Sequence, residues 1–392
     1  MGSDFASCEP DYIMGRARPW TGHGFGQLVP VRSLPSRGPP SFPAEVFVPA
    51  VPFVPAFPLP PIDLFMSRPR LTAILAVLLG FCLARPGYAE SRFGPTFATP
   101  KEAAQHPQFA VQGEYVGEQL AVQVVALGKG DYQIVIYRGG LPGDGWNGET
   151  PQVLDGGEDE VLDFTDGLEK VNRTSPTSGA KPPPGAVILF DGSKKSLEEN
   201  WQQGATMTDE GLLTQGATTA ETYQDFSAHV EFRVPFQPED QGQKRGNSGA
   251  YWQGRYETQV LDSFGLDPQS NDCGGIYRIA KPPVNVCFPP LSWQTYDVDF
   301  TAARFDDSGK KLKNARITVR LNSVLIHNDV ELPHSTTASP LKEGPEPGPL
   351  HLQDHGNPVR FRNIWLVPKD ADREARRPIV PGFERFYASV GN

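Results

Sequence analysis

A polar stretch in the second half of the chain carries the side chains best suited to chemistry. Under strand alternation, one face of this stretch presents Tyr251, Gln253, Arg255, Glu257 and Gln259. These groups supply hydrogen-bond donors, acceptors and a ring on which a hydroxyl-rich ligand can lie. A carboxyl group such as that of Glu257 can also exchange a proton during catalysis. The stretch therefore predicts a ligand-binding face with one acid/base candidate, and an ordinary solvated strand face is the alternative.

A second polar group lies nearer the C-terminus, where His351, Gln353 and His355 share one face of an expected strand. Two histidines four residues apart would also suit a zinc ion if they lay on a helix. Gly356 and Pro358 argue against that helix, and no glutamate follows the first histidine directly. We therefore expect a single histidine beside the polar face, with a hydrogen-bonded structural histidine as the alternative.

The elements that would position these residues are short strands separated by Gly, Pro, Asn and Asp. After a Pro-rich linker at residues 174–184, strand-like runs follow at short intervals and almost no amphipathic helix appears. The runs are Ala186–Phe190, Ala228–Val234, Ser248–Asp262, Trp293–Thr301, Ala315–Leu321, Val324–His327, Leu350–His355 and Val359–Val367. This rhythm predicts an all-β antiparallel sandwich or jelly roll over residues 185–369. A small β module is expected before it, at residues 90–173, with strand signals on either side of the turn Gly128–Asp131.

The N-terminal part of the chain reads as a segment that the mature protein lacks. Residues 1–65 hold 13 of the 40 prolines and no lysine. A short basic start at Met66, an apolar stretch of 13 residues and a small-residue cleavage site at Ala89 then follow, in the pattern of a signal peptide over residues 66–89. The apolar stretch is shorter than a membrane span requires. We therefore expect translation to start at Met66, a mature chain that begins at Glu90, and a periplasmic or secreted protein with no stable membrane span.

Two of the four cysteines remain after that trimming. Cys273 and Cys287 lie fourteen residues apart in a Gly- and Pro-rich stretch. In an oxidising compartment such a pair predicts one disulfide that pins a loop. A metal pair is less favoured, because there is no C-x-x-C spacing and no histidine between the two cysteines.

Composition excludes several classes of protein. The net charge is −10, with 36 basic and 46 acidic residues, whereas nucleic-acid binding needs clustered Lys and Arg. Aromatic residues make up 10% of the chain, which is too many for global disorder. At least one packed core is therefore expected.

Four motifs together resemble the 3-keto-disaccharide hydrolase domain family. They are Val187–Gly192, Gly246–Gly249, Tyr256–Asp262 and the pair Leu352–Gly356 with Phe361–Ile364. Their order and spacing match over about half of the chain. The resemblance implies a concanavalin A- or glucanase-like jelly roll that acts on glycosides whose sugar carries a ketone at C3, so the expected partner is a carbohydrate.

The implied ketone suggests how the glycosidic bond would break. A carbonyl at C3 acidifies the proton on C2, and the oxygen on C1 can then leave by elimination, after which water adds. This route needs a base near C2, an acid for the leaving oxygen, and donors or a cation at the C3 oxygen. The acid/base candidates are Glu257 and His355, the latter preferred because it lies within a matched motif. Direct hydrolysis by two carboxyl groups is the alternative.

The remaining site residues are assigned to substrate binding. They are Tyr251, Gln253, Arg255, Gln259, Gln353 and Asp262. Asp262 has a second interpretation as the cap of the turn before Gly265. The sequence identifies no cofactor and leaves a divalent cation such as calcium open.

Two rival functions share the same fold and polar face. A noncatalytic carbohydrate-binding module is the first alternative, and a structural or adhesive exoprotein is the second. Residues 370–392 read as an extended tail, and a chain truncated before a further domain is an open alternative.

Overall fold

The computed structural model describes residues 93–369. The expected Pro-rich extension, the signal peptide and its cleavage site, and the C-terminal tail lie outside the described residues. No helix within residues 93–369 is long and apolar enough to cross a membrane.

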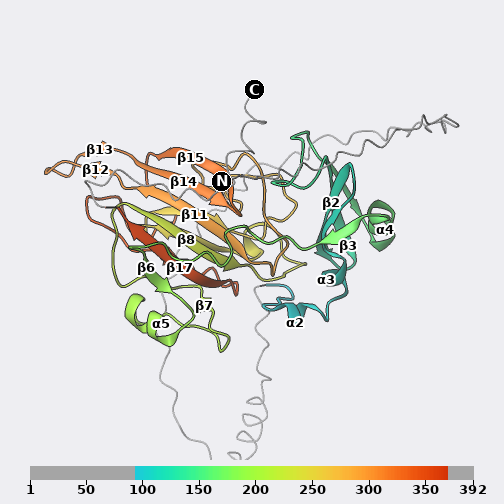
Figure 1. Ribbon diagram of the computed structural model, residues 1–392, viewed down its shortest axis with the longest axis horizontal. Helices are drawn as coiled ribbons and strands as arrows, with labels where there is room; N and C mark the ends of the chain where they lie inside the picture. Colours follow the sequence, from blue (N-terminus) through green and yellow to red (C-terminus); the bar gives the residue numbers. More distant parts are fainter. Residues whose placement is uncertain (1–92, 370–392) are drawn as a thin grey trace, which may run out of the picture. The chain divides into compact units, whose positions relative to one another are not determined.

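The small β module is an antiparallel sheet of five strands in the order β4-β3-β2-β1-β5 (Figure 1). Its elements are α2 (Pro100–Ala103), α3 (Pro107–Val111), β1 (Gly113–Val116), β2 (Leu120–Gly128), β3 (Asp131–Arg138), β4 (Gln152–Gly156), α4 (Glu158–Thr165) and β5 (Glu169–Val171). The expected turn joins β2 to β3, and Lys129 and Gly130 both have positive φ there. Val122, Val124 and Ile134 pack in one buried cluster with Phe236 of the following domain.

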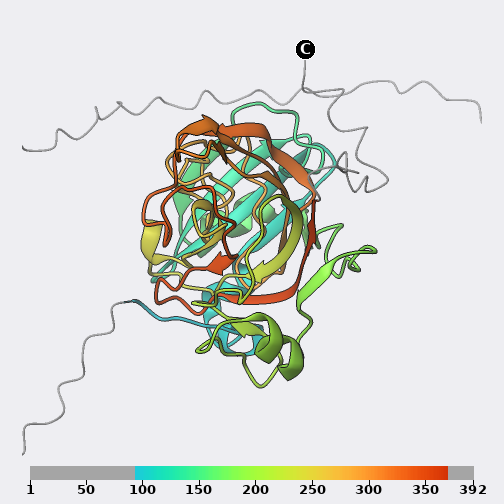
Figure 2. The same ribbon diagram turned by 90° about the vertical axis from the view of Figure 1, so that its left-hand side faces the viewer.

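The larger domain contains a seven-stranded antiparallel sheet in the order β15-β14-β11-β8-β17-β6, with β7 also paired to β17. Its elements are β6 (Val187–Phe190), α5 (Lys194–Asn200), β7 (Leu213–Thr214), β8 (Phe226–Arg233), β11 (Gln294–Thr301), β14 (Ala315–Leu321), β15 (Val324–Leu332) and β17 (Arg360–Pro368). Between β11 and β14 the chain forms a small hairpin of β12 (Arg304–Phe305) and β13 (Lys311–Lys313). Figure 2 shows β8 in yellow-green and β17 in red as neighbouring curved strands.

A three-stranded sheet in the order β10-β9-β16 packs against the larger one. Its strands are β9 (Ser248–Trp252), β10 (Tyr256–Val260) and β16 (His351–Leu352). Aromatic side chains join the two sheets across the core: Trp252 lies 6.2 Å from Phe226 and Tyr256 lies 5.6 Å from Phe300, measured between ring centroids. The predicted all-β jelly-roll sandwich after a small β module is confirmed.

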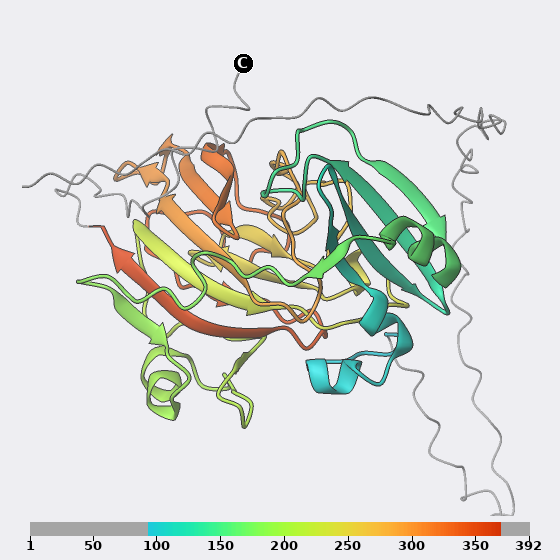
Figure 3. The same ribbon diagram turned by 45° about the vertical axis from the view of Figure 1, so that its right-hand side comes forward.

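The segment expected to be a free linker is held against the outer face of the seven-stranded sheet, as Figure 3 shows between β5 and β6. Thr177 Oγ1 donates to Asp297 Oδ2 (2.7 Å), and the Gly179 amide donates to Glu231 Oε1 (2.5 Å). Carboxylates of the sheet thus satisfy one hydroxyl and one backbone amide that a solvated linker would leave to water.

Candidate active site

The polar stretch is a hairpin and not the single strand expected over residues 248–262. Gln253 and Gly254 have φ of 54° and 61°, and the Arg255 amide donates to the Trp252 carbonyl (3.1 Å). Positive φ at both residues matches the right-handed twist of a hairpin, and the connection between the paired strands is the three residues Gln253 to Arg255. Glu257 consequently lies directly opposite Tyr251.

Glu257 lies at the centre of a buried cluster on the outer face of the three-stranded sheet. Tyr251 donates its hydroxyl to Glu257 Oε2 (2.8 Å), and Gln353 Nε2 donates to the Tyr251 hydroxyl (3.3 Å). In the orientation that its neighbours favour, the Gln259 amide nitrogen donates to Glu257 Oε1 (3.0 Å). The structure therefore brings four of the predicted site residues together.

A glycine makes room for this carboxyl group. A Cβ atom at Gly249 would stand 2.2 Å from Glu257 Oε1, so any side chain there would displace the carboxylate. Gly249 belongs to the Gly246–Gly249 motif, which would have pointed to it from the sequence. Its role follows only from the cross-strand pairing of Gly249 with Gln259, next to Glu257.

Enclosure changes the acidity of Glu257. The residue is 2% exposed, and burial raises the pKa of its carboxyl group to about 8, while the hydrogen bond from Tyr251 opposes the shift. A charged carboxylate loses hydration when it is buried, so the neutral form is favoured. Glu257 can therefore hold or release a proton near neutral pH, as an acid/base group must.

The histidine beside Tyr251 is His351, while His355 lies beyond the end of β16 in the segment before β17. His351 pairs with Tyr251 across the sheet, and their ring centroids are 5.7 Å apart. Its Nδ1 is 2.8 Å from Thr218 Oγ1, and burial lowers the pKa of the imidazole. The sequence pattern placed both histidines on one face, but β16 ends before His355.

The structure separates Gln253 and Arg255 from this cluster because both belong to the hairpin turn. Arg255 donates from Nε to the Lys342 carbonyl (2.7 Å) and from Nη1 to the Glu346 carbonyl (3.0 Å). Gln253 donates to the Tyr223 carbonyl (2.9 Å). Both side chains hold neighbouring backbone in this structure, and their role in substrate binding stays a prediction.

Asp262 forms a buried ion pair outside the cluster. Its Oδ2 accepts from Arg245 Nε (2.6 Å), and Arg245 Nη1 donates to the Ala126 carbonyl of β2 (3.0 Å). Asp262 Oδ1 also accepts from the Phe264 amide (3.3 Å), as a cap of the turn before Gly265 would. Of its two interpretations, the structure supports the cap.

The segment at residues 333–350, here called the strap, covers the cluster. Thr336 Oγ1 accepts from the Glu257 amide (2.9 Å), and Tyr256 donates its hydroxyl to Glu343 Oε1 (2.6 Å). Lys311 Nζ pairs with Glu343 Oε2 (2.8 Å). No local sequence signal marks the strap, because its contacts with the hairpin span about 80 residues.

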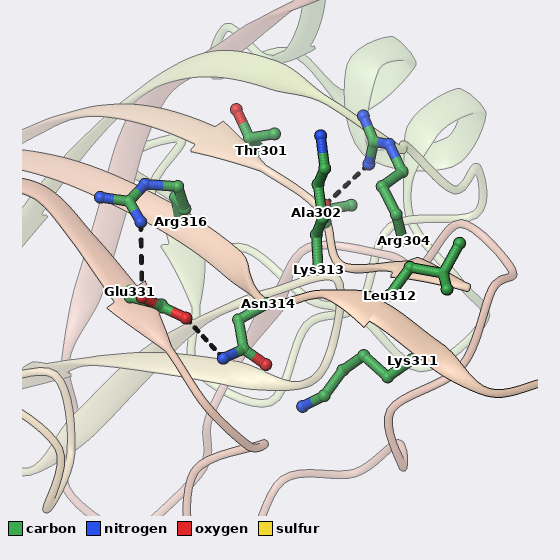
Figure 4. A pocket seen from close by; sticks show the side chains of 9 residues that line it. All are labelled: Thr301, Ala302, Arg304, Lys311, Leu312, Lys313, Asn314, Arg316 and Glu331. Carbon is green, nitrogen blue, oxygen red and sulfur yellow. Dashed lines mark hydrogen bonds and ion pairs between the residues drawn. The ribbon is translucent and has the colours of Figure 1, made fainter. Parts of the chain in front are cut away.

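A surface pocket of about 730 Å³ lies at the base of the β12–β13 hairpin (Figure 4). Its lining includes Arg304, Lys311 and Arg316, and Glu331 pairs with Arg316 at 3.6 Å. None of the predicted site residues lines this pocket. Its lining has four basic residues, Arg304, Lys311, Lys313 and Arg316, and one acidic residue, Glu331.

The predicted disulfide is absent. Cys273 and Cys287 are free thiols, buried beside each other, and Cys273 Sγ lies 3.4 Å from the Tyr296 hydroxyl. The hydrogen bond with Cys273 and burial raise the pKa of Cys287, so this thiol stays protonated. The loop is therefore pinned by packing and hydrogen bonds in place of a covalent bond. Within residues 93–369, no group of three His, Cys, Asp or Glu side chains is placed to hold a metal ion.

The fold by itself does not define a function, but the family match of this domain supports a glycoside hydrolase-like or carbohydrate-binding role. Residues 185–367 match the model of the 3-keto-alpha-glucoside-1,2-lyase-like domain. Through this domain, the chain belongs to that family. No curated protein matches the chain.

Solved structures similar to the chain include putative glycosyl hydrolases of Parabacteroides distasonis. One is 31% identical over 48% of this chain and 85% of its own, with a TM-score of 0.43. A second is 20% identical over 47% of this chain and 94% of its own, with a TM-score of 0.35. The carbohydrate-binding module CBM66 of Bacillus subtilis is 12% identical over 46% of this chain and 93% of its own, with a TM-score of 0.23.

Proposed function

We propose that residues 185–367 cleave 3-keto-glycosides by elimination and hydration, with Glu257 as the acid/base residue. The observation that carries this proposal is the enclosed Glu257 carboxyl group, whose pKa is raised to about 8 by burial. The family description names a 3-keto-α-glucoside lyase, and an elimination begins with proton removal from the carbon beside a ketone.

The reaction balances with one carboxyl group and one water molecule. The Glu257 carboxylate takes the proton from C2, the electron pair moves to the C3 oxygen as an enolate, and the C1–O bond then breaks as a C1–C2 double bond forms. A proton passes to the leaving oxygen, and water adds across the double bond. The net result is hydrolysis, and hydroxyl and amide donors such as Tyr251 and Gln353 stabilise the negative oxygen.

Substrate access requires movement of the strap, because Glu257 is 2% exposed beneath it. The strap is attached to the hairpin through Thr336, Glu343 and the carbonyls that Arg255 binds. We assign Arg255 to positioning the strap. Closure of such a segment excludes water from the enolate until hydration.

Replacement of Glu257 by Gln tests the proposal, because it keeps the shape of the side chain and removes proton exchange. We expect turnover of a 3-keto-glycoside to fall by at least about a hundredfold, the lower end of acid/base catalysis. Glu118→Gln is the matched control, since Glu118 is exposed between β1 and β2. Turnover within a few-fold of wild type would remove Glu257 from the role.

The second proton-transfer group is tested by a pair of histidine variants. His355→Ala and His351→Ala distinguish the histidine that the matched motif favours from the one that packs on Tyr251. If just one of these two variants loses turnover as strongly as Glu257→Gln does, the histidine that it replaces is the second proton-transfer group. Equal, small losses in both would leave Tyr251 as the donor to the leaving oxygen.

A noncatalytic carbohydrate-binding module is the second candidate function, because the cluster of Tyr251, Glu257 and Gln353 contains one carboxyl group where cleavage needs both a base and an acid. Binding of sugars without turnover of any 3-keto-glycoside would establish it. Neither binding nor turnover would favour a structural exoprotein.

We also propose that the protein is exported after cleavage behind Ala89. N-terminal sequencing of the native exported protein should find Glu90 first. A stable exported form that retains residues 42–61 would contradict the proposal.

A further inference from the structure

Two arginines face each other on the outer side of the seven-stranded sheet. Arg233 of β8 is directly opposite Arg360 of β17, and their neighbours Phe232 and Phe361 point into the core. Like charges directly opposite each other in a sheet are destabilising. This face lies on the other side of the sandwich from Glu257.

The two guanidinium groups have no carboxylate partner within residues 93–369. Arg233 is 9% exposed and its Nε is buried without a hydrogen bond, while Nη2 donates to the Ala98 carbonyl (3.3 Å). Arg360 Nη1 donates to Gln215 Oε1 (2.9 Å) and to the carbonyl of Val359 (3.0 Å). Both side chains therefore hold charge that neutral acceptors satisfy only in part.

The adjacent carboxylate cannot serve them because its oxygens are already occupied. Glu231 accepts from Arg362 Nε (2.7 Å), from Asn363 Nδ2 (2.8 Å) and from the Gly179 amide (2.5 Å). His229 also lies 3.4 Å from Glu231 Oε1. The charges of Glu102 and Glu210 act on both arginines from a distance, but neither carboxylate forms an ion pair with them within residues 93–369. Part of the positive charge of the arginine pair is thus left to a ligand or to solvent.

An aromatic ring stands beside the pair. The guanidinium carbon of Arg233 is 5.0 Å from the centroid of Trp293, and that of Arg362 is 4.0 Å from it. Trp293 and Arg360 are half-buried, so a ligand can reach them. Because the guanidinium groups of Arg233 and Arg362 already stack on the ring, a ligand would meet the Arg360 fork and the remaining exposed part of the indole, which offer partners for a carboxylate and for the apolar side of a sugar.

We propose that Arg233, Arg360 and Trp293 form a second site that binds the carboxylate of an acidic sugar residue. Planar guanidinium groups bind carboxylates through two parallel hydrogen bonds. Arg360 is half-buried and uses its Nη1 for Gln215 and Val359, so the other side of its fork is the part that a ligand reaches. Occupation of this site also relieves the repulsion between the two arginines. The site is separate from the proposed cleavage of 3-keto-glycosides, since its residues belong to the opposite sheet.

Titration of the mature full chain with galacturonate, galactose and acetate tests the proposal. We expect galacturonate to change the tryptophan fluorescence and raise the melting temperature, with weaker binding at high salt. Trp293→Phe should abolish the fluorescence change. Arg360→Gln should weaken galacturonate binding by at least about tenfold, as loss of a charge-assisted pair of hydrogen bonds predicts.

Two variants separate binding from folding. Arg316→Gln is the matched control, because Arg316 lies on the same sheet but is paired with Asp329 (2.7 Å) and should leave binding unchanged. Arg360→Lys keeps the charge without the fork and should bind with intermediate affinity. Glu257→Gln should bind galacturonate as wild type does. Failure of the proposed cleavage can therefore be distinguished from failure of this second site.

Three results would overturn the proposal. They are galactose binding as tightly as galacturonate, acetate binding as tightly as galacturonate, and wild-type affinity in a folded Arg360→Gln variant. The first removes the carboxylate from recognition, the second removes the sugar ring, and the third removes the arginine pair.

Discussion

The ionisation of Glu257 should make the whole protein less stable as pH rises. Its pKa is 4.5 in an unfolded chain and about 8 when enclosed beside Tyr251. A raised pKa means that the folded state binds the proton more tightly. The stabilising contribution is therefore fully present below about pH 4.5 and is lost as pH rises through about 8.

The size of the effect follows from the pKa difference. Each pKa unit is worth about 1.4 kcal/mol, and pH 7 is about 2.5 units above the unfolded value. The free energy of unfolding should therefore be about 3 kcal/mol lower at pH 7 than at low pH, through the ionisation of Glu257 in the unfolded chain. Glu257→Gln removes the titration and keeps an oxygen that can accept from Tyr251. We expect the variant to match wild type near pH 4 and to exceed its unfolding free energy by about 3 kcal/mol at pH 7.

Urea denaturation at pH 4, 5.5 and 7 measures this difference directly. Glu118→Gln serves as the control and should differ from wild type by the same small amount at each pH. A stability difference between Glu257→Gln and wild type that does not change with pH would refute the reasoning, because it would mean that Glu257 has no raised pKa in the folded protein.

Three further predictions concern other buried groups. Burial alone would lower the pKa of His229, but hydrogen bonds with two carboxylates raise it to about 9. The stabilising contribution of the protonated imidazole is therefore fully present below about pH 6.5 and is lost as the pH rises through about 9. Thermal melts should show that the stability of His229→Gln changes less over this pH range than the stability of wild type does. Gly249→Ala should push the Glu257 carboxyl group from its place and reduce turnover at least about tenfold in a folded protein, and wild-type kinetics would contradict this. Because the thiols of Cys273 and Cys287 are adjacent and buried, mild oxidant should join them, and nonreducing peptide mapping that finds both alkylated after oxidation would disprove it.

Much of the fold could be predicted from local patterns. The expected run Ala315–Leu321 is β14 to the residue. Ala186–Phe190 differs from β6 by one residue at its start, and Val359–Val367 differs from β17 by one residue at each end. Apolar and polar residues alternate in β14 because one face packs in the core. Such periodicity depends only on backbone geometry, and the sequence displays it directly.

The prediction that Tyr251, Glu257 and Gln259 share a face is correct, but the cause is a hairpin and not the single strand that the sequence indicated. Tyr251, Glu257 and Gln259 share a face because three residues, Gln253 to Arg255, separate the paired strands. A continuous strand would have placed the same residues together by simple alternation. The turn, however, removes Gln253 and Arg255 from that face, and positive φ at Gln253 is not evident from its residue type.

The sequence alone therefore determined the strands, the polar face and Glu257 as its acid/base candidate. Only the tertiary structure decided what surrounds that residue: Gly249 beneath its carboxyl group, Thr336 above it, and His351 in place of His355 beside Tyr251. It also decided that Arg233 and Arg360 meet, although they are far apart in the chain. The pKa of a carboxyl group depends on burial, and the repulsion within an arginine pair depends on partners brought from distant segments, so no local pattern encodes either of them.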